Sequence, residues 1–102
     1  MSYHLFSEKF PIAKKSHKCI WCGEQIKQGQ KYVREHSVYD GGFQNHPWHL
    51  ECRIDANDFW RENPGDEFLP YDNERPLLDI NTINSYLVSR KAKPLSLNPP
   101  VM

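Results

Sequence analysis

The sequence predicts a small α+β domain that consists of a cysteine-bearing turn, a β-hairpin and a helix, followed by a second helix near the C-terminus. Three observations lead to this fold class. First, two cysteines enclose a tight turn that ends in Gly23. Second, a Gly-rich turn at residues 40–42 separates two runs of β-forming residues. Third, apolar residues recur at helical spacing after this turn. With 102 residues, of which 38% are hydrophobic, the chain buries only about two thirds of its unfolded surface. A core of this size commonly needs a metal ion or another staple.

The β-hairpin is predicted around the turn at residues 40–42. The preceding residues 31–39 form a strand rich in Tyr and Val, and residues 43–45 form the returning strand. The Asp-Gly-Gly turn is a strong hairpin signal because these residues accept a positive φ at little cost.

Two helices are predicted, at residues 47–62 and 82–91. Proline suits the first helical position, and an Asn-Pro-Gly sequence stops the first helix. Either Asn81 or Asp79 caps the second helix. Each helix has one apolar face at steps of three and four residues. The two faces comprise Cys52, Ala56, Phe59 and Trp60 in the first helix, and Ile80, Ile83 and Leu87 in the second.

These elements divide the chain into four parts. They are an N-terminal basic arm (1–18), a metal-binding core (19–62), an acidic loop with the C-terminal helix (63–93) and a mobile tail (94–102). The arm surrounds Pro11 and could add one edge strand, since proline is excluded from central strands.

Four residues form a metal-ligand pattern, C-x2-C followed after 26 residues by H-x2-C. Zinc prefers four nitrogen or sulfur ligands in a tetrahedron, and structural sites fill all four positions with protein side chains. A C-x2-C turn brings two thiolates to one ion, and ligands three apart on a helix point the same way. The alternative is that the cysteines are buried without a metal and that the histidine lies on the surface. This alternative does not explain why the two motifs occur together. The sequence therefore predicts one structural Zn²⁺ ion bound by Cys19, Cys22, His49 and Cys52.

His46 is the competing ligand, because it lies three residues before His49. It precedes Pro47 and so lies just outside the predicted helix, which favours His49. His36 is expected on the hairpin strand, facing solvent.

Further residues extend this pattern: Cys19-Ile20-Trp21-Cys22-Gly23, then Ile26, Gly29 and Tyr32, then Trp48-His49 with Cys52. The pattern resembles treble-clef zinc fingers. It is similar to the LIM-type finger, to the DNA-break-sensing finger of poly(ADP-ribose) polymerases, and to small zinc-finger proteins of bacteriophages and prophages. The resemblance covers residues 14–60 and implies a treble clef with the same four ligands. No cysteine remains for the second zinc of a LIM domain, and the acidic second half of the chain departs from the basic face of the polymerase finger.

The sequence indicates an intracellular protein. No run approaches the roughly 20 apolar residues of a membrane helix, and the N-terminus lacks the apolar run of a signal peptide. Three cysteines cannot all pair as disulfides within one chain, and thiols stay reduced inside cells. We therefore expect a cytoplasmic protein without membrane association, and the phage resemblance implies a phage-infected bacterial host.

The charges are segregated along the chain, although the net charge is zero. Residues 1–34 carry seven Lys or Arg against two Glu, a net charge of +5. Residues 35–79 carry three Arg against eleven Asp or Glu, a net charge of −8, and residues 80–102 carry three cations and no acid. Nucleic-acid binders usually have a net basic domain. We therefore expect first a non-catalytic adaptor or inhibitor module that binds a protein partner.

The protein partner is expected to meet exposed aromatic residues, which often anchor interfaces. The expected surfaces are Trp21 at the tip of the cysteine turn, the hairpin tip from Tyr39 to Phe43, and the acidic loop 62–79.

Nucleic-acid binding through the basic N-terminal third is the alternative function. Lysines interleaved with Trp21 and Tyr32 would suit phosphate contacts and base stacking. The cations concerned are Lys9, Lys14, Lys15, Lys18, Lys27, Lys31 and Arg34.

Catalysis is not expected. His49-Leu50-Glu51 matches the H-x-E opening of the zinc deaminase signature, but here C-x-x-C comes first and lacks the proline. Four protein ligands also leave zinc no position for water. Glu51 is better explained as a first-turn residue that the helix dipole favours.

Overall fold

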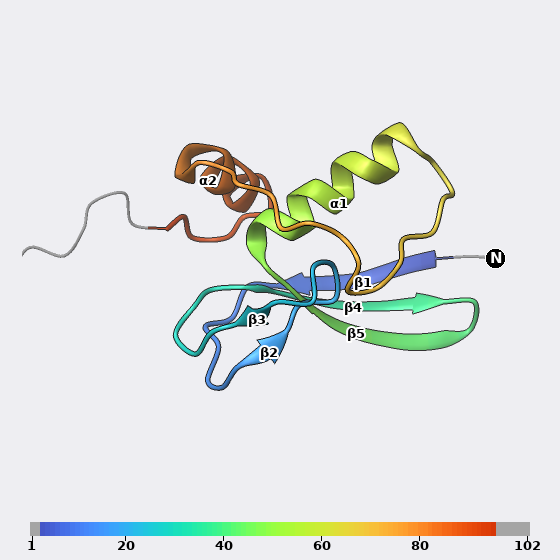
Figure 1. Cartoon of the computed structure of the whole chain (residues 1–102), viewed down its shortest axis with the longest axis horizontal. Helices are drawn as coiled ribbons and strands as arrows, with labels where there is room; N and C mark the ends of the chain where they lie inside the picture. The colour runs from blue at the N-terminus through green and yellow to red at the C-terminus, as the bar shows by residue number, and fades with distance from the viewer. Residues whose placement is uncertain (1–2, 96–102) are drawn as a thin grey trace, which may run out of the picture.

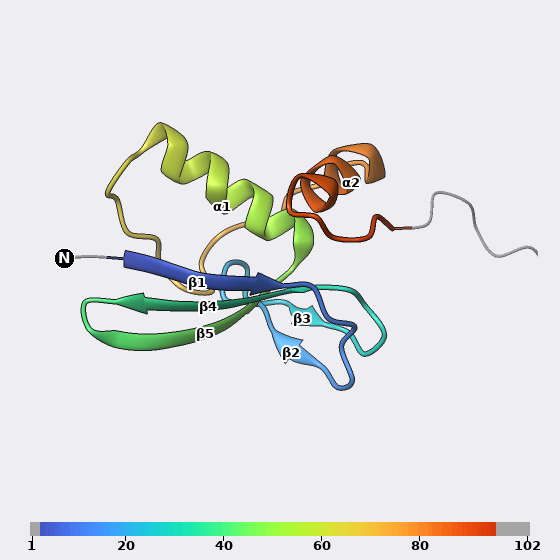
Figure 2. The ribbon, with the colours of Figure 1, turned by 180° about the vertical axis from the view of Figure 1, so that it is seen from behind.

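The computed structural model describes residues 3–95, which form an α+β fold with two helices and antiparallel strands (Figure 1). This confirms the predicted α+β class with two helices. A three-stranded sheet has the order β1-β4-β5, and β2 pairs with β3 in a separate ribbon. Both helices lie on the same side of the three-stranded sheet (Figures 1 and 2). The elements are β1 (Tyr3–Lys9), β2 (His17–Lys18), β3 (Gln25–Ile26), β4 (Val33–Tyr39), β5 (Gly42–Trp48), α1 (Leu50–Glu62) and α2 (Ile80–Ser89).

The central strand β4 has one covered and one uncovered face, because successive side chains of a strand point to opposite sides. Val33, Glu35 and Ser37 are buried on the side of the helices. The alternate residues of β4 are only half-buried. We call the two sides of the three-stranded sheet the inner face, toward the helices, and the outer face. The outer face comprises Arg34, His36 and Val38 with their cross-strand partners in β1 and β5.

The hairpin turn confirms the prediction for residues 40–42. Asp40 and Gly41 both have positive φ, 51° and 83°, as a two-residue turn between twisted strands requires. Tyr39 pairs with Gly42 across this turn. The returning strand is longer than predicted and continues to Trp48, which pairs with Val33.

The predicted start of the first helix at Pro47 is wrong, because Pro47 lies in β5 opposite Arg34. β5 is an edge strand, where a residue without an N–H group is tolerated, so the proline suits this strand as well as a helix start. His49 follows as the N-cap with φ −60° and ψ 150°, and α1 begins at Leu50. The end of α1 at Glu62 agrees with the predicted Asn-Pro-Gly stop.

α2 begins two residues before its predicted start. Asp79, one of the two predicted caps, accepts a hydrogen bond from the backbone N–H of Thr82 at 2.8 Å. Ile83 and Leu87 are buried, as the predicted apolar face requires. Among the described residues, no helix combines the length and the apolar character needed to cross a lipid bilayer.

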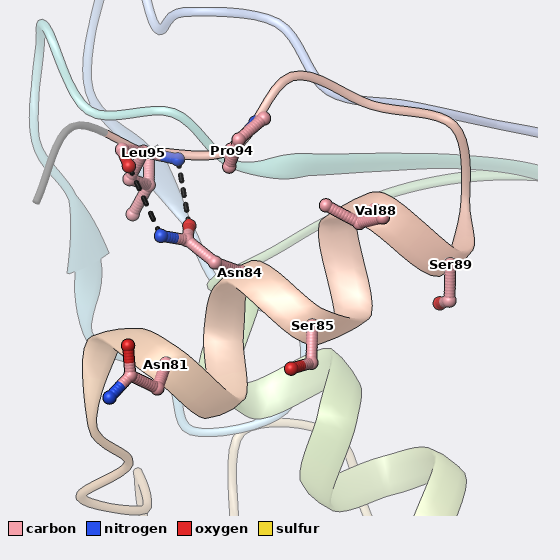
Figure 3. Close-up of a pocket in the computed structure, with 7 residues that line it drawn as sticks. All are labelled: Asn81, Asn84, Ser85, Val88, Ser89, Pro94 and Leu95. Carbon is pink, nitrogen blue, oxygen red and sulfur yellow. Dashed lines mark hydrogen bonds between the residues drawn. The ribbon is translucent and has the colours of Figure 1, made fainter.

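An open groove of about 630 Å³ lies between α2 and the segment that follows it (Figure 3). Asn84 holds this segment through two hydrogen bonds with Leu95: its Oδ1 accepts from the Leu95 N–H at 2.7 Å, and its Nδ2 donates to the Leu95 carbonyl at 3.1 Å. The side chains that line the groove are small and uncharged. Of the predicted tail, 94–102, only Pro94 and Leu95 belong to the described residues.

The core between the sheet and the helices is aromatic. Trp48 of β5 is almost completely buried and stacks on Trp21, with 6.1 Å between the ring centroids. Phe68, from the loop after α1, lies 5.4 to 5.7 Å from the rings of Trp21, Trp48 and Trp60. The loop after α1 therefore folds back over the core.

The N-terminal segment forms β1, the edge strand that the arm could supply, and it is joined to α1 by a buried ion cluster. The cluster consists of Glu8 in β1, Glu35 in β4 and Arg53 in α1, all at most 6% exposed in their side chains. Nε of Arg53 donates to Oε2 of Glu8 at 2.6 Å, and its Nη1 lies 3.6 Å from Oε1 of Glu35. The cluster ties an edge strand to the helical layer.

Glu35 stays ionised within the buried ion cluster. Burial opposes its ionisation, but the charge of Arg53 and hydrogen bonds from Tyr3, Ser37 and Trp48 outweigh burial and lower the pKa of Glu35 below its ordinary value. These three donors lie 2.6, 2.8 and 2.9 Å from the carboxylate oxygens. The carboxylate thus has the partners that a buried charge requires.

Candidate metal centre

The first two candidate ligands lie on a tight turn between β2 and β3. The N–H of Cys19 donates to the carbonyl of Glu24, and the N–H of Gly23 donates to the carbonyl of Cys19, both at 3.0 Å. The N–H of Ile20 donates to the carbonyl of Pro47 at 2.9 Å, which fastens the turn to β5. The chain therefore reverses sharply between the two cysteines, and the reversal is fixed next to the strand that leads into α1.

The other two candidate ligands lie at the junction of β5 and α1. Their relationship differs from the prediction, because His49 is the extended N-cap and only Cys52 lies in the first turn of α1. The backbone N–H of His49 donates to Sγ of Cys19 at 3.3 Å, and the N–H of Glu24 donates to Sγ of Cys22 at 3.4 Å. Such N–H donors stabilise the thiolate form of cysteine.

The structure brings together all four residues that the sequence predicts as ligands. One ligand atom from each of Cys19, Cys22, His49 and Cys52 lies within 4.8 Å of the others. Three of these residues are buried, and Cys22 is partly exposed. The cluster could hold one metal ion. His46 does not belong to it, because it lies in β5 opposite Glu35.

The ring of His49 is oriented by a hydrogen bond that sequence reasoning missed. Its Nε2 lies 3.1 Å from the carbonyl oxygen of Gln25, whereas its Nδ1 lies 3.4 Å from Sγ of Cys22 and 3.6 Å from Sγ of Cys52. A carbonyl can only accept, so Nε2 carries the proton and Nδ1 directs its lone pair toward the sulfurs. Metal-bound histidines usually hold their second nitrogen in this way.

The protonation of the three thiols shows why the cluster suits a cation. A hydrogen bond from Cys52 outweighs burial, and with help from His49 and nearby backbone N–H groups it lowers the pKa of Cys19 to about 3. The same hydrogen bond, burial and the closeness of Cys19 and Cys22 raise the pKa of Cys52. Burial also raises the pKa of Cys22. The thiols alone therefore favour a single thiolate, whereas a bound metal ion would let all three ionise.

The loop after α1 covers the cysteine turn. The N–H of Tyr71 donates to the carbonyl of Ile20 at 2.9 Å, and the backbone N–H and side-chain Nδ2 of Asn73 donate to the carbonyl of Trp21 at 3.1 and 3.2 Å. Trp21 itself is buried, so the expectation that it is exposed is wrong. Its Nε1 donates to Asp55 of α1 at 3.2 Å.

Arg75 joins the turn to the helix beside the metal-ligand cluster. Its guanidinium lies 3.8 Å from a carboxylate oxygen of Glu24 and 3.3 Å from one of Glu51. Sequence reasoning treated residues 62–79 as an acidic exposed loop and missed this role. The available signal was that Arg75 is the only cation in that stretch.

Gly23 provides a test of the contact between the loop and the turn. We expect Gly23→Ala to lower the free energy of unfolding by about twice as much as Gly29→Ala, which should cost about 1 kcal/mol. Both glycines have positive φ, 78° and 91°, but a Cβ at Gly23 would lie 3.1 Å from the carbonyl oxygen of Tyr71, whereas one at Gly29 meets nothing within 4 Å. Urea denaturation of the metal-loaded variants measures the difference, and equal losses would show that the loop does not press on the turn.

The other candidate partner-binding residues lie on separate parts of the surface. Lys14 and Lys15 are exposed in the segment before β2, and Lys18 places its Nζ 4.1 Å from the ring centroid of Tyr71. At the far end of the sheet, Phe43 is 87% exposed. Tyr39 is partly buried, and its hydroxyl donates to Glu67. Figure 1 shows that the segment before β2 and the hairpin tip lie at opposite ends of the strands.

Comparison of the chain with family models, with curated proteins and with solved structures finds no match. The resemblance to treble-clef fingers therefore stays a prediction from the motif.

Proposed function

We propose that Cys19, Cys22, His49 and Cys52 bind one structural zinc ion, and that the protein is a non-catalytic binding module built on this site. The observation that carries the proposal is the spacing of the ligand atoms. In a tetrahedral site with Zn–S and Zn–N bonds of about 2.3 and 2.0 Å, a sulfur and a nitrogen lie about 3.5 Å apart. The distances from Nδ1 of His49 to Sγ of Cys22 and to Sγ of Cys52 are 3.4 and 3.6 Å.

The set of ligands also supports zinc. Three thiolates and one imidazole form a common structural zinc site, and soft sulfur ligands disfavour magnesium, calcium and manganese. One pair of ligands comes from the cysteine turn, and the other pair comes from the junction between the hairpin and the helix. This arrangement supports a treble-clef-type organisation.

Two features support a non-catalytic role. Four protein ligands complete a tetrahedron, so the ion would retain no position for a water molecule or a substrate. Glu51, the acidic residue of the H-x-E sequence, pairs with Arg75 at 3.3 Å and is therefore engaged in a structural contact.

Protein and nucleic acid are the two candidate classes of partner. The sequence favours a protein, but Trp21 is buried, which removes one of the three expected surfaces. The loop 62–79 contacts the cysteine turn through Tyr71 and Asn73 and otherwise stays largely exposed. A specific observation favours nucleic acid, the alternative. The carboxylates of β1 and β4 face inward, and most of the other acidic residues follow in α1 and its loop on the helical side. A basic surface can therefore exist on a protein without net charge.

Elemental analysis tests the metal proposal. We expect about one zinc ion per chain in the purified protein and in His46→Ala, and loss of zinc in His49→Ala. His49→Cys should retain zinc, because four thiolates also form a structural site. This variant separates the loss of a ligand from a general failure to fold. Equal loss of zinc from His46→Ala and His49→Ala, or a folded wild-type protein without metal, would refute the proposed site.

A further inference from the structure

The outer face of the sheet carries two exposed aromatic rings near the hairpin end. Phe6 is 58% exposed and Phe43 is 87% exposed. Their ring centroids are 6.3 Å apart with the planes tilted by 32°, and the ring of His4 lies 4.9 Å from that of Phe6. The register of β1 on β4 shifts between Leu5 and Ser7, and Phe6 is the residue at this shift. Neighbouring exposed rings on an open sheet are a platform on which bases can stack.

The other end of the outer face carries two cations in cross-strand positions. Lys9 of β1 pairs directly with Arg34 of β4. Like charges placed opposite each other destabilise a sheet unless an anion neutralises them. Within the described part of the chain, neither cation forms an ion pair at 4.0 Å or less.

Arg34 is held in place by neutral groups. Its Nη2 donates to the hydroxyl of Tyr32 at 3.0 Å, and its Nη1 donates to Oδ1 of Asn45 at 3.3 Å. These contacts orient the guanidinium without cancelling its charge. Such an arrangement suits an anionic oxygen from outside the protein, and a phosphate in particular.

The outer face is free of competing carboxylates along the three strands. Glu8 and Glu35 are the acidic residues of β1, β4 and β5, and both face inward in the buried ion cluster. Asp40 lies beyond the strands, in the hairpin turn. The acidic residues of α1 belong to the other layer of the structure (Figure 2). The charge separation that the sequence shows along the chain thus becomes a separation between layers.

We propose that the outer face binds single-stranded nucleic acid, with bases stacked on Phe6 and Phe43 and phosphates bound by Lys9 and Arg34. This inference rests on the proposed binding-module function and names its partner. Along β4, the four residue steps from Val38, which pairs with Phe43, to Arg34 span about 13 Å. That length matches up to about four stacked nucleotides at roughly 3.4 Å each. A single strand is required, because paired bases cannot expose their faces to the rings.

Fluorescence anisotropy with the full-length, zinc-loaded protein tests this inference. The probes are labelled single-stranded DNA and RNA of about ten nucleotides, a length within the usual range of site sizes. Loss of one stacking ring should weaken binding about tenfold, so Phe43→Ala and Phe6→Ala should each have this effect. Leu77→Ala, which changes a fully exposed side chain elsewhere, is the matched control and should bind like the wild type.

The charged end predicts a defined salt dependence. Two phosphate contacts correspond to a slope of about −1.4 in log K against log salt, so affinity should fall about sevenfold between roughly 50 and 200 mM salt. Arg34→Gln and Lys9→Gln should each reduce the size of this slope by about 0.7, whereas Lys93→Gln should leave it unchanged.

Several outcomes would overturn the inference. The first two are no binding at low salt and unchanged binding in Phe6→Ala and Phe43→Ala. A third is a loss of binding only when Lys14, Lys15 and Lys18 are changed to Glu. A fourth is equal binding of poly-glutamate, which would indicate a site for acidic proteins. Zinc content and circular dichroism of the same samples keep the two proposals apart. A zinc-loaded, folded protein that fails to bind contradicts only the nucleic-acid surface, whereas a folded protein without zinc contradicts the metal centre.

Discussion

Removal of the proposed zinc ion by a strong chelator is expected to unfold residues 19–60, and Cys52→Ala is expected to have the same effect. Structural zinc contributes on the order of 10 kcal/mol to the folding of zinc-finger peptides, which is comparable to the whole free energy of unfolding of a typical domain. Cys19 and Cys52 are completely buried. Without the metal, the partners of their thiols are one another, Cys22, His49 and a few backbone donors.

The tryptophans beside the site provide the readout. Trp21 lies between two ligands in the chain and stacks on Trp48, so loss of the metal should expose both rings and shift their fluorescence to longer wavelength. Far-ultraviolet circular dichroism should lose the signal of α1, while α2 could keep part of its order through its own apolar face. His46→Ala serves as the control with unchanged spectra. A chelated protein with unaltered fluorescence and circular dichroism would contradict the structural role of the ion.

Arg53→Met is expected to lower the free energy of unfolding by about 3–5 kcal/mol at pH 7. The substitution keeps the length of the side chain but removes the counter-ion of Glu35 and leaves Glu8 only the half-exposed Arg90, 3.4 Å away. A buried charge that loses its partner is costly. Arg61→Met on the same helix is the matched control. The ion pair of Arg61 with Asp58 is 73% and 52% exposed, and such pairs contribute about 0.2–1 kcal/mol.

A double-mutant cycle isolates the ion cluster. Urea denaturation of zinc-loaded Arg53→Met, Glu35→Gln and the double variant should show that the double variant loses less stability than the two single variants together. The pKa of Glu35 is lowered in the folded protein, so its contribution to stability is complete above its ordinary pKa of 4.5 and is lost as the pH falls through the lower folded value. Measurements at pH 7 therefore report the full effect. Additive losses would show that Arg53 and Glu35 are not coupled in the folded protein.

The sequence by itself determined the features that depend on short spacings. The C-x2-C and H-x2-C motifs identified the four residues that meet in the cluster, because a tight turn and a short junction leave little freedom within each pair. The Asp-Gly-Gly turn predicted the hairpin because few residues tolerate positive φ. Asp79 was among the predicted caps because its carboxylate can reach a backbone N–H three residues later.

Only the tertiary structure decided the features that depend on contacts between distant segments. Pro47 is compatible with both a helix start and an edge strand, and its pairing with Arg34 selected the strand. The carbonyl of Gln25 selected Nδ1 of His49 as the candidate ligand atom, since no local pattern orients an imidazole ring. The loop after α1 buried Trp21, which its position at the tip of a turn did not indicate. The register of β1 on β4 turned Glu8 inward and Lys9 outward, and this alternation separates the buried ion cluster from the basic outer face.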